Sequence, residues 1–418
     1  MLNALPPLVR SPSLHGAMIF AMSGAAFALG NLLMASAMAK SHYAHFALVL
    51  AILAITSNIG PLGLDQILLR RDVRAGWRYL APILASTTIL AMLAAAIAYP
   101  LYGINPRAVT ALAMATISFA LLRTSACGLR RHGMALTATL CETSADWCIL
   151  AIGMASWAGW IADEASASLA LATAGSVMMA VAHIILLRQE RDTPADTGPF
   201  RFIEAIPLLG IVAAGAALVQ AERLLIPFVL SLEELATFAV LTSVAIAPFR
   251  VLSAGIVASL TQQLRGLHTL QERRELLARE IRIFAVLSGI SALIVCTIAP
   301  PVANIFTGGR YGVGIGLCLA ACVNGIVKIL QAVPRAVATG IGTAADLHRV
   351  NVSMWLCVLG TILGALFCAP WGLSTFMLGA ATGSGLGTLP ALLMVRKKLS
   401  LPTSSSSAGA PADVPTIA

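Results

Sequence analysis

The chain has 418 residues, of which 58% are apolar and only 11% charged, and its mean hydropathy is +0.88. A soluble domain carries about 25% charged residues, so this composition excludes a soluble enzyme or binding module. The net charge of +9 does not indicate a nucleic-acid partner, because the basic residues lie in short segments between apolar runs and not along one groove.

Twelve apolar runs are long enough to cross a bilayer, which takes about 20 residues per helix. They predict an all-α polytopic membrane protein with spans near 15–38, 43–64, 79–100, 108–127, 133–158, 166–187, 203–228, 234–262, 282–305, 312–336, 348–370 and 372–395. The first run is longer than a signal-peptide core and has no convincing cleavage site after it, so we expect it to stay as a span.

The basic residues alternate from loop to loop as the positive-inside rule requires. Of the 27 lysines and arginines, 21 fall on the side of the two termini and four on the other side, at Lys40, Arg107, Arg223 and Arg310. Trp157, Trp160 and Trp371 lie at the predicted outer boundaries. The pattern predicts twelve spans with the N and C termini in the cytoplasm.

The spans divide six and six around a polar segment. We predict a cytoplasmic N-terminus at 1–14, an N-terminal six-helix bundle at 15–187, a cytoplasmic linker at 188–202, a C-terminal six-helix bundle at 203–396 and a disordered cytoplasmic tail at 397–418. The charged segment 263–281 has leucines at helical spacing and is expected to form an amphipathic helix on the inner membrane surface; a solvated loop is the alternative.

A short repeat relates the two halves. Ala44-x-Phe46-Ala47-Leu48 recurs 192 residues later as Ala236-x-Phe238-Ala239-Val240, in the second and eighth predicted spans. Two halves of the same topology, with substrate bound between them, are a known transporter plan. The repeat therefore favours a transporter over a channel or a membrane enzyme.

Charged side chains inside predicted spans are the candidate functional residues, because each costs at least about 2.5–3.5 kcal/mol unless it faces a cavity or a partner. The repeat places Arg250 opposite Asn58, and it places the pair Glu222 and Arg223 opposite Gly30 and Asn31. The expected substrate-binding residues, Arg250, Lys328, Arg223, Asn58, Asn31, Asn324 and Gln331, would line one shared cavity.

Two helix faces carry further polar residues. Asn324, Lys328, Gln331 and Arg335 follow one another at spacings of four, three and four, which puts them on one face of span ten. The loop pattern assigns Arg335 to the inner side. Glu142 and Asp146, four apart in span five, are coupling candidates together with Glu222.

These residues admit two interpretations. Cationic groups in a hydrated cavity would receive an anionic headgroup, for which arginine offers paired donors in a fixed fork. Alternatively, the charges pair with one another and hold the bundle together. The sequence has no HExxH, Walker or GxSxG motif and no acidic triplet at metal spacing, so we expect no enzyme activity, no metal and no cofactor.

Four stretches carry a resemblance to a known family: Phe46–Arg71, Gln220–Leu241, Asn304–Ala320 and Ala369–Gly387. The chain resembles the polysaccharide-repeat flippases (the Wzx or O-antigen exporter type) of the multidrug/oligosaccharidyl-lipid/polysaccharide (MOP) exporter superfamily. The family commonly has an acidic or asparagine residue near the position of Glu222. The related lipid II flippases usually have fourteen spans, and this chain has twelve.

The resemblance implies a MATE-like fold and a flippase of the bacterial inner membrane that moves an undecaprenyl-pyrophosphate-linked oligosaccharide by alternating access during surface polysaccharide biosynthesis. It also implies a coupling ion, H⁺ or Na⁺, polymerase or glycosyltransferase partners, and no nucleic acid. One rival is a MATE-like multidrug or cation antiporter that uses Glu142 and Asp146. A second rival is a membrane-embedded polymerase or ligase that acts on the same lipid-linked sugars.

Overall fold

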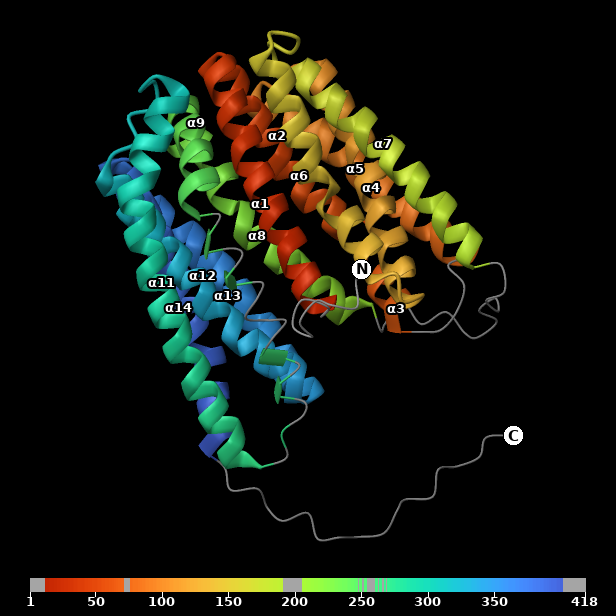
Figure 1. Cartoon of the computed structure of the whole chain (residues 1–418), viewed down its shortest axis with the longest axis vertical. Coiled ribbons are helices and arrows are strands. Elements are labelled where there is room, and N and C mark those ends of the chain that lie inside the picture. The colour runs from red at the N-terminus through yellow and green to blue at the C-terminus, as the bar shows by residue number, and fades with distance from the viewer. Residues whose placement is uncertain are drawn as a thin grey trace, which may run out of the picture.

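The structure is a computed structural model that describes residues 12–70, 76–190, 205–246 and 269–400, together with 248–249, 252–253, 260–261, 263–264 and 267. Every regular element of this described part is a helix (Figure 1). The helices are α1 (Pro12–Ala37), α2 (Lys40–Ile59), α3 (Leu64–Arg70), α4 (Trp77–Tyr102), α5 (Pro106–Arg131), α6 (Ala135–Trp157), α7 (Glu164–Gln189), α8 (Ile206–Val229), α9 (Leu232–Leu241), η3 (Thr242–Ile246), α11 (Leu270–Thr307), α12 (Ile315–Ile341), α13 (Ala344–Cys368), η4 (Ala369–Trp371) and α14 (Leu373–Ser400).

Eleven of the described helices are long and apolar enough to span a membrane, and they coincide with eleven of the twelve predicted spans. The remaining prediction, span 234–262, begins as α9 and continues into the π-helical turn η3, and most of its second half lies outside the described residues. The all-helical, multi-pass architecture predicted from hydropathy is confirmed.

The segment 263–281 differs from the prediction of a separate surface helix. From Leu270 onward it forms the first turns of α11, a single helix of 38 residues. A capping box starts this helix, since the Thr269 hydroxyl accepts from the Glu272 N–H and the Glu272 carboxylate accepts from the Thr269 N–H. At 1.5 Å per residue α11 is about 57 Å long, so it extends well beyond the hydrocarbon of a bilayer.

The helices form two bundles with the same packing order, which we call the N-terminal bundle (α1–α7) and the C-terminal bundle (α8–α14). α1 packs on α6 as α8 packs on α13, and α5 packs on α7 as α12 packs on α14. α2 joins the bundles by packing along α8 and α9. The repeat seen in the sequence is therefore a repeat of tertiary structure. The exact domain boundaries stay a prediction, because the linker 188–202 lies largely outside the described residues.

Glycines allow the tightest helix contacts in both bundles. In α13 and α14, Gly360 and Gly364 face Gly383 and Gly379, and a Cβ added at Gly383 would lie 1.9 Å from the Gly360 carbonyl oxygen. The two glycines within each helix are four residues apart, which is the small-residue pattern that brings membrane helices into backbone contact. In the N-terminal bundle, Gly30 of α1 plays the same part against α6.

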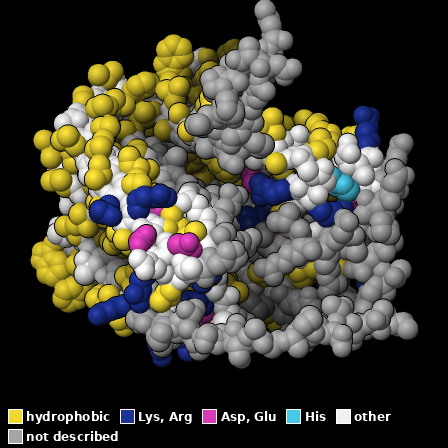
Figure 2. All heavy atoms as spheres, turned by 60° about the horizontal axis from the view of Figure 1, so that its bottom comes forward, with side chains coloured by type: hydrophobic (Ala, Val, Ile, Leu, Met, Phe, Trp, Pro, Cys, Tyr) yellow, Lys and Arg dark blue, Asp and Glu magenta, His cyan; other side chains and the backbone are white. Residues whose placement is uncertain are grey.

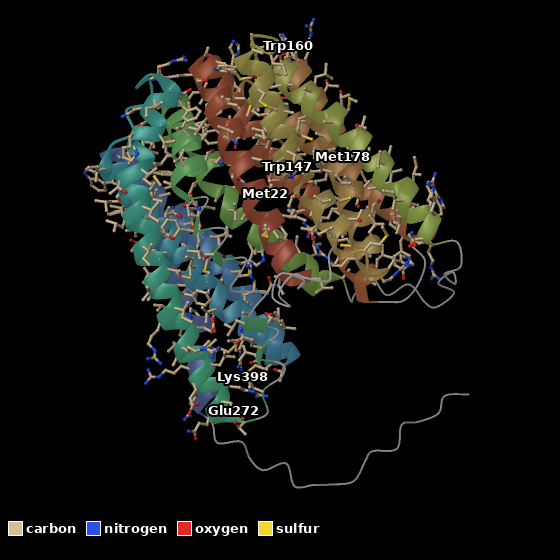
Figure 3. All side chains as sticks on the ribbon, viewed as in Figure 1. Met22, Trp147, Trp160, Met178, Glu272 and Lys398 are labelled. Carbon is tan, nitrogen blue, oxygen red and sulfur yellow. The ribbon has the colours of Figure 1, made fainter. Side chains whose placement is uncertain are left out.

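The two ends of the molecule differ. Glu272 at the start of α11 and Lys398 near the end of α14 lie at one end, which we call the basic end, and Trp160 lies at the opposite end (Figure 3). Basic side chains are spread over the basic end, and hydrophobic side chains cover its flank (Figure 2). The last turns of α5 and α14 contribute Arg130, Arg131, Lys397 and Lys398 to it. Toward this end the ribbons of the two bundles separate, and at the opposite end they lie together (Figure 1).

Candidate functional site

The predicted residues Glu222, Lys328 and Asn324 meet between α8 and α12, and we call them the α8–α12 cluster. The Lys328 ammonium lies 3.2 Å from one Glu222 carboxylate oxygen and 3.4 Å from the other. The Asn324 amide donates to Glu222 at 2.5 Å. Glu222 is 2% exposed and Asn324 1% exposed, so this charge is compensated inside the protein and not by water.

Arg223 points away from this cluster toward the junction of the bundles. Its guanidinium donates to the Thr242 hydroxyl at 2.9 Å and lies 3.4 Å from the Gln220 side-chain oxygen. Thr242 begins η3, and such π-helical turns recur at functional sites because they reorient side chains within a helix. Across the junction, Asn31 of α1 accepts from the Tyr43 hydroxyl at 3.3 Å. Buried polar side chains from both bundles therefore lie near the junction of the bundles.

A cavity of about 260 Å³ lies inside the C-terminal bundle, among α8, α12, α13 and α14. Most of its lining is apolar, from residues such as Leu218, Phe249 and Met354. Three polar side chains of α12 line it as well, namely Lys328, Gln331 and Arg335. Their spacing of three and four residues is the pattern that the sequence indicated, and the structure shows that this face is turned into the bundle.

Arg335 was not among the residues expected to bind substrate, because its position near the end of α12 suggested the inner surface. The structure places it six residues before the end of the helix, on the wall of the cavity. No hydrogen bond or ion pair joins its guanidinium to another side chain of the described residues. The regular spacing from Lys328 was the signal that could have identified it.

Asn58 lies apart, in the N-terminal bundle. Its side-chain oxygen accepts from the Arg123 guanidinium, which also lies 3.0 Å from the Asp65 carboxylate. Asp65 is 2% exposed, so Arg123 neutralises a fully buried acid. We call these three residues the α2–α5 cluster. It is a separate ionic site, and the structure does not bring Asn58 to Lys328.

The other predicted residues are not part of the α8–α12 cluster. Glu142 pairs with Arg130 at 2.8 Å, on partly exposed turns of α5 and α6 toward the basic end. Gln331 donates to Ser384 of α14. Asp146 lies one turn beyond Glu142 on α6. Arg250 lies outside the described residues, so its assignment stays a prediction.

At the opposite end, the loop between α11 and α12 contacts the N-terminal bundle. Gly308, Gly309 and Gly312 adopt positive φ values, which a chain of L-residues tolerates mainly at glycine. The tight loop that they form presents Arg310, which donates to the main-chain oxygens of Ser36 and Met38 at 3.2 and 3.3 Å.

Tyr311 extends this contact, because its hydroxyl donates to the Ala35 carbonyl at 3.1 Å. Burial raises the pKa of Tyr311 to about 12, so the hydroxyl remains a neutral donor at physiological pH. Lys40 and Glu233 add an exposed ion pair of 3.4 Å between the bundles. The conformation is therefore closed at the opposite end.

The described residues gather no three His, Cys, Asp or Glu side chains in a metal-binding arrangement. The eight cysteines are all free. The site thus consists of cations, one paired carboxylate and amides in an apolar setting.

No protein-family model matches the chain, and no curated protein matches it in sequence. Solved structures do match. An inward-facing multidrug-resistance MATE-family transporter of the MOP superfamily superposes with a TM-score of 0.67 at 14% identity, over 92% of this chain and 98% of that chain. The lipid II flippase MurJ, in an inward closed conformation, superposes with a TM-score of 0.64 at 11% identity, over 91% and 87%.

An outward-facing conformation of a MOP-superfamily MATE transporter gives a TM-score of 0.62 at 15% identity, over 93% of this chain and 94% of that chain. At such identities the similarity establishes the fold. The chain is a multi-pass membrane protein with the MATE- and MurJ-like arrangement of two six-helix bundles.

Proposed function

We propose that the protein is a flippase that moves a lipid-linked oligosaccharide, carried on undecaprenyl pyrophosphate, across the bacterial inner membrane. The basic end faces the cytoplasm in this proposal, as the positive-inside rule requires of the side that holds most basic residues. The two bundles rock about their junction, so that the cargo site is reached alternately from either side. The conformation closed at the opposite end is then the inward-open state.

The observation that carries the proposal is the excess of cations over acids within the membrane. Lys328 and Arg335 line the cavity, Arg223 is buried at the junction, and Glu222 is the acid paired with Lys328. A multidrug antiporter for cations needs carboxylates where its cargo binds. An excess of cations suits the phosphate groups of a lipid-linked sugar.

Asn31 and Arg223 contribute polar groups at the junction, and Arg250 belongs to the same site in this proposal. Arg250→Ala and Lys328→Gln should each abolish export while the protein still inserts. Glu222, whose carboxylate touches Lys328, is the leading coupling residue because cargo and coupling ion would compete for the same ammonium. Glu142 is a weaker coupling candidate, since Arg130 already neutralises it.

The test is an analysis of undecaprenyl-linked sugars by mass spectrometry in a deletion strain, together with staining of its surface polysaccharide. We expect lipid-linked repeat units to accumulate on the cytoplasmic leaflet while surface polymer disappears. Accumulation on the outer leaflet would instead indicate a polymerase or ligase. Unchanged sugars would contradict the flippase proposal.

A second candidate function is a MATE-like antiporter for drugs or cations. The fully buried carboxylate of Glu222 favours it, because acids in such cavities bind cations or protons. This candidate predicts sensitivity to toxic cations on deletion, with normal surface sugars. Glu222→Gln would then abolish efflux.

A further inference from the structure

The cavity inside the C-terminal bundle holds a charge that forms no ion pair within the described part of the chain. Its walls come from α8, α12, α13 and α14 and from the stretch after η3, so it lies within one bundle and not between the two. The Arg335 guanidinium lines it and makes no ion pair with the described residues. The Arg335 side chain is only partly exposed, so its guanidinium has given up part of its hydration without gaining an ion pair there. A bound anion would restore the missing interaction.

A second cation stands at the other end of the same wall. Lys328 precedes Arg335 by seven residues, about 10 Å along the α12 axis, and both side chains line the cavity. Two of the lining hydroxyls are already engaged, because Ser353 donates to the Gly387 carbonyl at 2.7 Å and Thr388 to the Ser384 carbonyl at 2.9 Å. The Ser253 hydroxyl also lines the cavity, but the charges that recognise an anion are those of the two cations.

We propose that this cavity is a binding site for a phosphate-type anion, held by Arg335 and Lys328. The guanidinium fork matches a phosphate through two parallel N–H···O bonds, and the ammonium supplies a point charge. The apolar walls strengthen both interactions, since the effective dielectric there is low. The volume of about 260 Å³ is just below the roughly 300–1,000 Å³ of drug-sized pockets, which suits a phosphate or diphosphate group.

Glu222 regulates this site through Lys328. The ammonium is shared between the Glu222 carboxylate and the cavity, so an anion that draws Lys328 inward must compete with the carboxylate. The Asn324 amide donates to Glu222 at 2.5 Å and is a second partner of the carboxylate beside the ammonium. Removing the charge of Glu222 should consequently strengthen anion binding, whereas removing either cation should weaken it.

The anion could be free in solution or part of a lipid, and the test separates these sources. The full-length protein in lipid nanodiscs is titrated with inorganic pyrophosphate in one arm and with geranylgeranyl diphosphate in the other. Arg335→Gln should weaken binding by about 10- to 100-fold, the loss expected for hydrogen bonds to a charged group. Arg349→Gln is the matched control, because this arginine is 64% exposed on α13 and should leave binding unchanged.

Binding in both arms with loss in Arg335→Gln supports the site and shows that the headgroup suffices. Binding of the diphosphate lipid alone, again lost in Arg335→Gln, supports it with a lipid as the source. Equal affinities in Arg335→Gln and Arg349→Gln, or no saturable binding in either arm, would overturn the proposal.

Two further variants guard against a misfolded Arg335→Gln protein. Lys328→Gln should also weaken binding, and Glu222→Gln should tighten it by about 3- to 10-fold; an unchanged affinity in Glu222→Gln would refute the competition. The measurement needs no knowledge of the cargo, so it can fail while the flippase proposal stands, and it can succeed where export assays show no polysaccharide defect.

Discussion

In the N-terminal bundle, the buried carboxylate of Asp65 is matched by Arg123, and Asn58 completes the set. In the C-terminal bundle, Glu222 is matched by Lys328 in the same way, but Arg335 is added on the wall of a cavity. The two bundles thus share one packing order but differ in the charged side chains that they hold. The acid of the α2–α5 cluster is paired, as in a structural site, whereas Arg335 of the C-terminal bundle has no ion pair among the described residues and can be used by a ligand.

The largest loss of stability is expected from a variant of the α2–α5 cluster, and it tests whether this cluster is structural. Arg123→Ala removes an ion pair from the buried Asp65 carboxylate, and we expect the free energy of unfolding to fall by about 3–5 kcal/mol. Arg130→Ala is the control, because its pair with Glu142 is partly exposed and should contribute at most about 1 kcal/mol. Unfolding of both variants by denaturant titration in micelles measures the difference. Equal losses would show that burial does not distinguish the two pairs.

A second prediction compares the glycine contacts of the bundles. Gly383→Ala would place a Cβ 1.9 Å from the Gly360 oxygen, and Gly153→Ala would place one 2.4 Å from the Gly30 oxygen. Both should reduce the free energy of unfolding by about 1–3 kcal/mol, since the helices must move apart. Gly289→Ala in α11 meets nothing within 4 Å and should not destabilise the protein. Thermal unfolding of the three variants checks this order.

A third prediction examines the ion pair of the α8–α12 cluster by a double-mutant cycle. Lys328→Met alone removes the ion pair of the buried Glu222 carboxylate, and Glu222→Gln alone removes the same ion pair from the Lys328 ammonium. The double variant should be more stable than the sum of the single losses predicts, with a coupling of about 1–3 kcal/mol. Additive losses would mean that the two side chains do not interact in the protein.

The smallest effect concerns the contact that closes the opposite end. Arg310→Ala removes two hydrogen bonds between the bundles, and we expect a shift of about 1 kcal/mol toward a conformation open there. Spin labels at the exposed positions Trp160 and Ile305, in a background without the native cysteines, would report a longer distance. Arg107→Ala, at the same end, is the control, and Lys40→Ala should change little because its ion pair is exposed.

The sequence by itself determined the spans, the repeat and the helical face that carries Lys328, Gln331 and Arg335. These features are local, because a bilayer requires about 20 apolar residues per helix and an α-helix repeats every 3.6 residues. The helix predicted at 263–281 is continuous from Leu270 with the next span, which the sequence did not show because nothing in a charged amphipathic segment says whether it ends before the span or continues into it.

Only the tertiary structure decided which charges meet. Glu222 finds Lys328 more than a hundred residues away, while Asn58 turns to Arg123 and leaves the expected site. Arg335 looked like an inner-surface residue, but the packing of α12 against α13 and α14 places it on the wall of a cavity. Each pairing depends on how the helices cross and rotate against one another, which hydropathy does not encode.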